Sequence, residues 1–141
     1  MKNKKKVHID TYESIYPIML VVANESTTPK QIAKDYCWFN GTEFEEEDFA
    51  NCAGCVMRAR RKSDERSVVL VKINDYMSLK QGKSDTFLED ICTLVHEAGH
   101  VVLDTYSYIE DRICVEMCKQ EPFCYYLQWV FECIYKTISK K

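Results

Sequence analysis

The C-terminal third of the chain constrains the fold most, because its apolar residues recur at helical spacing. One stripe is formed by Leu88, Ile91, Val95, Ala98 and Val102. These positions lie three or four residues apart and therefore share one face of a helix. A second stripe follows Pro122, at Phe123, Leu127, Val130, Ile134 and Ile138. The pattern predicts two long amphipathic helices at the end of the chain.

The first half of the chain predicts strands and one short helix. We expect a buried strand over residues 15–23 and a hairpin of strands over 55–60 and 67–74, with its turn at 62–66. A helix should begin at Thr28 and Pro29 and run to about Trp38. Strands followed by helices indicate the α+β class, in one domain over residues 1–141.

Charge and hydropathy exclude two classes of function. The net charge is -3 and no basic stripe is present, which argues against nucleic-acid binding. No apolar run is long enough to cross a bilayer, and no secretory signal pattern opens the sequence. We therefore expect a cytoplasmic protein that does not bind membranes, and the oligomeric state stays open.

The chain is rich in cysteine, at positions Cys37, Cys52, Cys55, Cys92, Cys114, Cys118, Cys124 and Cys133. A cytoplasmic location favours reduced thiols. Cys92, Cys124 and Cys133 fall in the apolar helical segments, where we predict small buried side chains. The Cys52-x-x-Cys55 pair leaves three roles open: structural residues, which we favour, a second zinc site with Cys37 or with Cys114 and Cys118, or redox chemistry.

The sequence His-Glu-Ala-Gly-His, residues 96–100, lies within the first of the two predicted helices. Residues four apart lie one turn above each other on the same helical face, so His96 and His100 can share one metal ion. Imidazole nitrogens suit zinc, and Glu97 lies beside them to act as a general base. This H-E-x-x-H pattern predicts metal-assisted hydrolysis.

Catalytic zinc sites usually have three protein ligands, so one more is required. Glu121 is the better candidate, because it opens the last helix and an antiparallel helix pair would bring it back over the first helix. Glu116 is the runner-up. Asp104 lies one turn past His100 and could bind the metal or orient a ligand histidine.

An H-E-x-x-H helix followed by a helix with a glutamate ligand resembles the gluzincins, the thermolysin-like branch of zinc peptidases. The segment Gln120–Ile138 also resembles the C-terminal segment of small zincin-like proteins of tailed phages and prophages, which carry an E-P-F-A-Y-L type of sequence. Glu121, Pro122, Phe123, Tyr125 and Trp129 match that pattern. The N-terminal half matches in outline only.

The resemblance implies a minimal zincin-like domain, with a small mixed or antiparallel sheet, an active-site helix and a C-terminal helix. His96, His100 and Glu121 would bind Zn²⁺, and Glu97 would be the catalytic base. Tyr125 would be a second catalytic residue that donates to an oxyanion, or else an aromatic residue at the helix seam. The resemblance also implies a strand edge that holds an extended peptide, which we assign to residues 67–74.

Three functions follow from these features. The first is a zinc metallopeptidase that acts on a peptide or protein in the cytoplasm, which is the host cytoplasm if the chain is phage-encoded. The second is a non-catalytic zinc-binding scaffold or host-interaction protein with the same fold. The third is a thiol-based metal or redox module. Glu97 favours the first, because a protein that only binds zinc does not need this acid.

Overall fold

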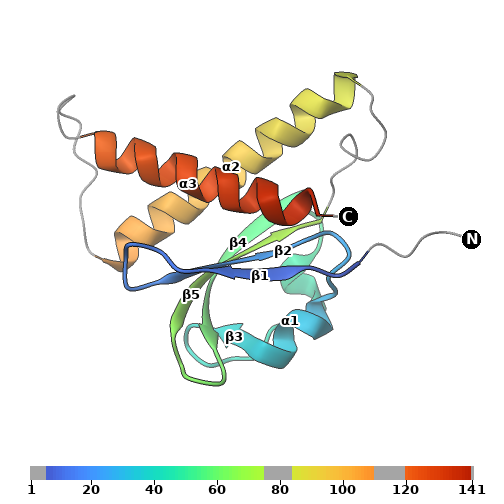
Figure 1. Ribbon diagram of the computed structural model, residues 1–141. Coiled ribbons are helices and arrows are strands. Elements are labelled where there is room, and N and C mark those ends of the chain that lie inside the picture. The colour runs from blue at the N-terminus through green and yellow to red at the C-terminus, as the bar shows by residue number, and fades with distance from the viewer. Residues whose placement is uncertain (1–5, 75–83, 110–119, 141) are drawn as a thin grey trace, which may run out of the picture.

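The computed structural model describes residues 6–74, 84–109 and 120–140. The elements in chain order are β1 (Ile9–Tyr12), β2 (Met19–Ala23), α1 (Pro29–Asp35), β3 (Tyr36–Trp38), the short 3-10 helix η1 (Glu46–Phe49), β4 (Gly54–Arg61), β5 (Ser67–Ile73), α2 (Ser84–Tyr108) and α3 (Glu121–Ile138). Figure 1 shows α2 and α3 crossing over one face of the sheet, with α1 on the other. The predicted α+β class is confirmed.

The five strands form one mixed sheet in the order β1-β2-β5-β4-β3. β2 and β5 are parallel, and the other neighbours are antiparallel. β5 is therefore paired on both sides, and our prediction that residues 67–74 offer a free edge to a peptide is wrong. β4 is different, because β3 covers only Ala59–Arg61 of its outer side. From Gly54 to Met57 no strand of the described chain pairs with that side.

β5 divides its side chains between two cores. Val69, Val71 and Ile73 belong to the cluster under α2 and α3, whereas Val68 and Leu70 face the cluster under α1. Successive strand residues point to opposite faces, so both faces of a central strand must be apolar when helices cover both. The predicted hairpin of β4 and β5 is confirmed.

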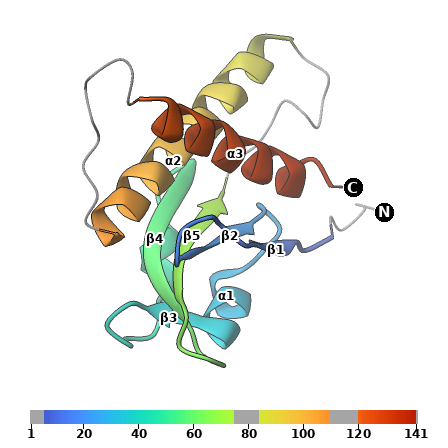
Figure 2. The same cartoon turned by 60° about the vertical axis from the view of Figure 1, so that its left-hand side comes forward.

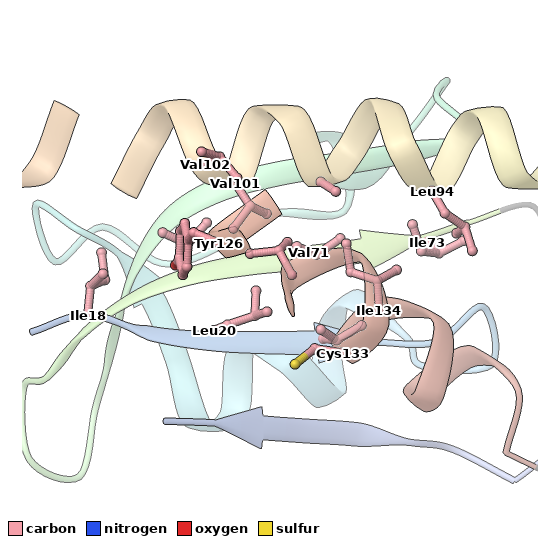
Figure 3. Packing of buried hydrophobic residues seen from close by; sticks show 14 of the residues in the cluster. Ile18, Leu20, Val71, Ile73, Leu94, Val101, Val102, Tyr126, Cys133 and Ile134 are labelled. Atoms are coloured by element: carbon pink, nitrogen blue, oxygen red, sulfur yellow. The ribbon is translucent and has the colours of Figure 1, made fainter. Parts of the chain in front are cut away.

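The larger core lies between the sheet and the two long helices (Figure 3). The predicted stripe of α3 is confirmed, with Val130, Ile134 and Ile138 buried. The predicted stripe of α2 is wrong in part, because Leu88 is 67% and Val95 49% exposed. The buried face of α2 is instead formed by Leu94, Ala98, Val101, Val102, Thr105 and Tyr106. α2 has more apolar residues than one face holds, and its contacts with the sheet and α3 decide which are buried.

The N-terminal half differs from the prediction at its short elements. Thr28 caps α1, since its side chain accepts from the Gln31 backbone amide. The helix ends at Asp35, and residues 36–38 form β3 rather than its last turn. β1 was not predicted, because four residues with one exposed side chain carry a weak strand pattern. None of the helices in the described segments is both long and apolar enough to cross a membrane.

Candidate metal centre

His96 and His100 lie side by side on the outward surface of α2. Their Nε2 atoms are 3.1 Å apart and their ring centroids 4.7 Å apart. Two nitrogens bound to one tetrahedral zinc at the usual bond length are about 3.3–3.4 Å apart. Both rings are exposed to solvent. The two histidines therefore share one face of α2, as their spacing predicted, and their separation and exposure are compatible with binding one metal ion.

Glu97 points to one side of this pair, toward the beginning of β4. Its residue is only 5% exposed, because the side chain lies against the backbone of Gly54. Burial raises the pKa of the Glu97 carboxyl above its ordinary value of 4.5, and the nearby imidazoles of His96 and His100 partly oppose this shift. A carboxyl with a raised pKa is a stronger base once ionised, as general-base catalysis near neutral pH requires.

His96 and Glu97 open onto a pocket of about 400 Å³ between α2 and the segment that leads into β4. It is lined by Cys52, Ala53, Gly54, Cys92, Thr93, His96 and Glu97. β4 runs under α2 in Figure 2, which brings these two segments together although they are distant in the sequence. Most of the lining side chains are small and uncharged, so a ligand there has space beside one acid and one imidazole.

The described residues do not bring a third ligand to the pair. No group of three or more His, Cys, Asp or Glu side chains that could hold a metal occurs in residues 6–74, 84–109 and 120–140. The Tyr126 hydroxyl lies 3.1 Å from the Thr105 hydroxyl. Thr105 is nine residues after His96, which at 100° per residue places it on the opposite side of α2. This contact between α2 and α3 therefore lies on the side of α2 that faces away from His96. Glu121 opens α3 and is exposed, so its role as third ligand stays a prediction.

The other predicted site residues lie apart from the pocket or outside the described chain. Tyr125 is 67% exposed and lines a separate apolar pocket with Ile15 and Trp129. Asp104 lies near Arg58, whose Nε is 3.9 Å from the Asp104 carboxylate. Glu116 falls outside the described residues, so the structure does not compare it with Glu121.

Three features of the pocket were missed in the sequence analysis. Cys92 was predicted to be buried but is exposed, and it lies one turn before His96. This four-residue spacing was the signal that could have placed it beside the histidines. Cys52 also lines the pocket, although its pairing with Cys55 had suggested a separate site. Gly54 had no sequence signal, because only the packing of β4 on α2 brings it to Glu97.

The remaining cysteines divide by burial. Cys133 is buried, as predicted, but Cys124 is exposed on α3. Cys37 is also buried, whereas Cys114 and Cys118 lie outside the described residues. The second zinc site considered for Cys37, Cys52 and Cys55 is not formed by the described side chains.

No known family model matches the sequence, and comparison with curated proteins and with solved structures likewise finds no match.

Proposed function

We propose that the chain is a small zinc-dependent hydrolase that cleaves peptide bonds. One observation carries the proposal: the Nε2 atoms of His96 and His100 lie 3.1 Å apart on the exposed side of α2, and the buried Glu97 lines one pocket with His96. Two histidines that only stabilise a helix do not need an acid between them and the sheet. The zincin-like form of the α+β fold is part of this proposal.

His96 and His100 would hold the metal through Nε2, with both nitrogens unprotonated. A bound zinc ion polarises a carbonyl oxygen and lowers the pKa of water. Glu97 accepts a proton from the attacking water on a carboxylate oxygen and then delivers it to the leaving amine nitrogen. Burial supports both steps, because a raised pKa brings the carboxyl closer to the pH at which it must gain and lose the proton.

The open side of β4 is the place where an extended peptide would bind. Gly54 to Met57 have no strand partner on that side within the described chain, and Gly54 itself lines the pocket. A peptide that adds a strand there makes main-chain hydrogen bonds to β4, and its scissile bond comes to lie near His96 and Glu97. This assignment replaces residues 67–74.

A non-catalytic zinc-binding protein is the second candidate, and a specific observation favours it. The described residues supply two metal ligands and not three, whereas catalytic zinc usually has three protein ligands. Glu121 is our proposed third ligand, with Glu116 as the alternative. A chain with neither would bind zinc weakly and would not hold it for hydrolysis.

Zinc content and peptide cleavage test the proposal together. We expect one zinc per chain in the purified protein and in Glu97→Gln, and loss of zinc in His100→Ala. A peptide library should be cleaved by the wild type, and Glu97→Gln should lower the rate by at least about 100-fold. Glu121→Ala and Glu116→Ala identify the third ligand, because only one of them should lose zinc.

The outcomes separate the candidates. Bound zinc without any cleavage, in wild type and Glu97→Gln alike, would favour the scaffold. Zinc retained after loss of both His96 and His100 would move the metal to the cysteines. A protein that binds no zinc after reconstitution overturns the hydrolase proposal.

A further inference from the structure

We propose that Gly54 is a positioning residue that seats the Glu97 side chain beside the histidine pair. The catalytic consequence rests on the proposed hydrolase function, but the packing on which the proposal is built does not. Gly54 is the first residue of β4 and pairs with Ile73 of β5. At Gly54, β4 also lies against the Glu97 side chain of α2.

The space that a side chain at position 54 would occupy is filled by Glu97. A Cβ atom built on Gly54 would lie 2.8 Å from Glu97 Cγ and 2.9 Å from both Cδ and Oε1. Carbon atoms in contact are separated by about 3.5–4.0 Å. Any residue other than glycine would therefore force Glu97 to leave its present position.

The backbone of Gly54 does not itself require glycine. Among the described glycines, Gly41 has a positive φ of 89°, whereas Gly54 does not lie in that region. Alanine could therefore take the same backbone conformation at position 54 without strain. The close approach of Glu97 is what excludes it.

Packing rather than hydrogen bonding holds the carboxylate. The Glu97 carboxylate makes no hydrogen bond to another described residue, although Glu97 is only 5% exposed. The contact with Gly54 therefore sets the direction of the side chain toward the pocket that it shares with His96. A displaced carboxylate would still be present in the protein but would lie in the wrong place to accept a proton.

The first experiment measures the packing by thermal unfolding in zinc-saturated buffer. Gly54→Ala should lower Tm by about 3–6 °C, because one added methyl group overpacks the contact. In a Glu97→Ala background the same change should leave Tm equal or higher, because alanine loses less entropy than glycine on folding. Gly99→Ala is the matched control: its Cβ would meet nothing within 4 Å, and Tm should rise.

The second experiment measures positioning in the zinc-loaded protein. Gly54→Ala should bind the same amount of zinc as the wild type and show a similar KM, while kcat falls by about 10- to 100-fold. Glu97→Ala removes Cγ, Cδ and Oε1, so adding Gly54→Ala to it should not lower the residual rate further. A purely structural role for Gly54 would not predict this dependence on residue 97.

Failure of the two proposals is distinguishable. If the wild type cleaves no peptide, the hydrolase proposal fails and the unfolding experiment alone decides the role of Gly54. If Gly54→Ala lowers Tm equally with glutamate and with alanine at position 97, the proposed positioning role of Gly54 is overturned. It is also overturned if Gly54→Ala cleaves peptides as fast as the wild type.

Discussion

Lys72 carries a charged amine into the interior of the sheet. The residue is 2% exposed, and its Nζ donates to the Ile73 carbonyl oxygen at 2.7 Å. Burial lowers the pKa of Lys72 to about 8, and the nearby Cys55, Glu25 and Cys52 partly oppose this shift. The same burial raises the pKa of Cys55 to about 12. Side chains alternate along β5, so Lys72 lies on the same face as Val68 and Leu70, which is buried under α1 and where a charge is costly.

We predict that Lys72→Met stabilises the protein at pH 7 by on the order of 1–3 kcal/mol. The folded state disfavours the ammonium, so between about pH 8 and 10.5 the unfolded chain binds more protons and the unfolding free energy rises with pH. Lys72→Met should lose this rise. Denaturant unfolding between about pH 7.5 and 9 measures it below the range in which Cys55 titrates.

Lys30→Met is the matched control for this prediction, because Lys30 is exposed on α1. Its unfolding free energy should follow the wild type at every pH. Equal stability of Lys72→Met and wild type at pH 7 would show that the buried amine is fully compensated.

At the scale of single elements, α1 is a short helix that depends on its cap. It has seven residues, which is too few for stability from its own hydrogen bonds. Thr28 and Gln31 form a capping box, and Ile32 anchors the helix in the smaller core. The cap satisfies backbone groups that the first turn leaves unpaired.

We therefore predict that Thr28→Ala lowers the free energy of unfolding by about 1 kcal/mol. Urea unfolding followed by circular dichroism measures the change. Lys30→Ala, an exposed substitution two residues further along, should stay within about 0.5 kcal/mol of the wild type. If both variants lose the same amount, the loss in Thr28→Ala is not specific to the cap.

α3 carries two neighbouring tyrosines with different surroundings. Tyr126 is buried with its hydroxyl 3.1 Å from that of Thr105, and its ring stacks on Trp129. Tyr125 is exposed next to it. Tyr126 is therefore the structural tyrosine, and Tyr125 is the one that the sequence predicted to be catalytic.

Tyr126→Phe should cost about 1 kcal/mol of stability, because Thr105 loses its partner in the core. Tyr125→Phe should leave stability unchanged. Thermal unfolding measures both, and peptide cleavage by Tyr125→Phe tests its predicted oxyanion role: an unchanged kcat would remove Tyr125 from the catalytic set, and a large decrease would place it at the transition state.

At the scale of the whole molecule, the sheet separates two cores and leaves the pocket at the surface. The exposure of the cysteine side chains differs between the surface and the cores. Cys52 and Cys92 lie at the pocket and Cys124 on α3, all exposed, whereas Cys37 and Cys133 are buried. Burial also raises the pKa of Cys133 to about 11, which makes its thiolate scarce at neutral pH.

We predict that iodoacetamide modifies Cys52, Cys92 and Cys124 in the native protein and modifies Cys37 and Cys133 only after unfolding. Peptide mass spectrometry at several times measures each site separately. Modification of Cys133 at the rate of Cys124 would contradict the packing of α3 on the sheet. Zinc should not protect Cys52 or Cys92 if the histidines hold the metal.

The sequence by itself determined the features that depend on near neighbours in the chain. His96 and His100 had to lie together once their segment was helical, because four residues make about one turn. The β4–β5 hairpin and the apolar face of α3 followed from their periodicity in the same way. The short strands β1 and β3 did not, since three or four residues carry too little pattern to outweigh their surroundings.

Tertiary structure alone decided which surfaces meet. It buried Leu94 and Val101 rather than Leu88 and Val95, and it enclosed β5 between β2 and β4, while no strand of the described chain pairs with the outer side of the beginning of β4. It also brought Gly54 to Glu97, 43 positions away in the chain (97 − 54). Contacts of this kind depend on how elements distant in sequence share one core, and packing admits only some of the arrangements that local patterns allow.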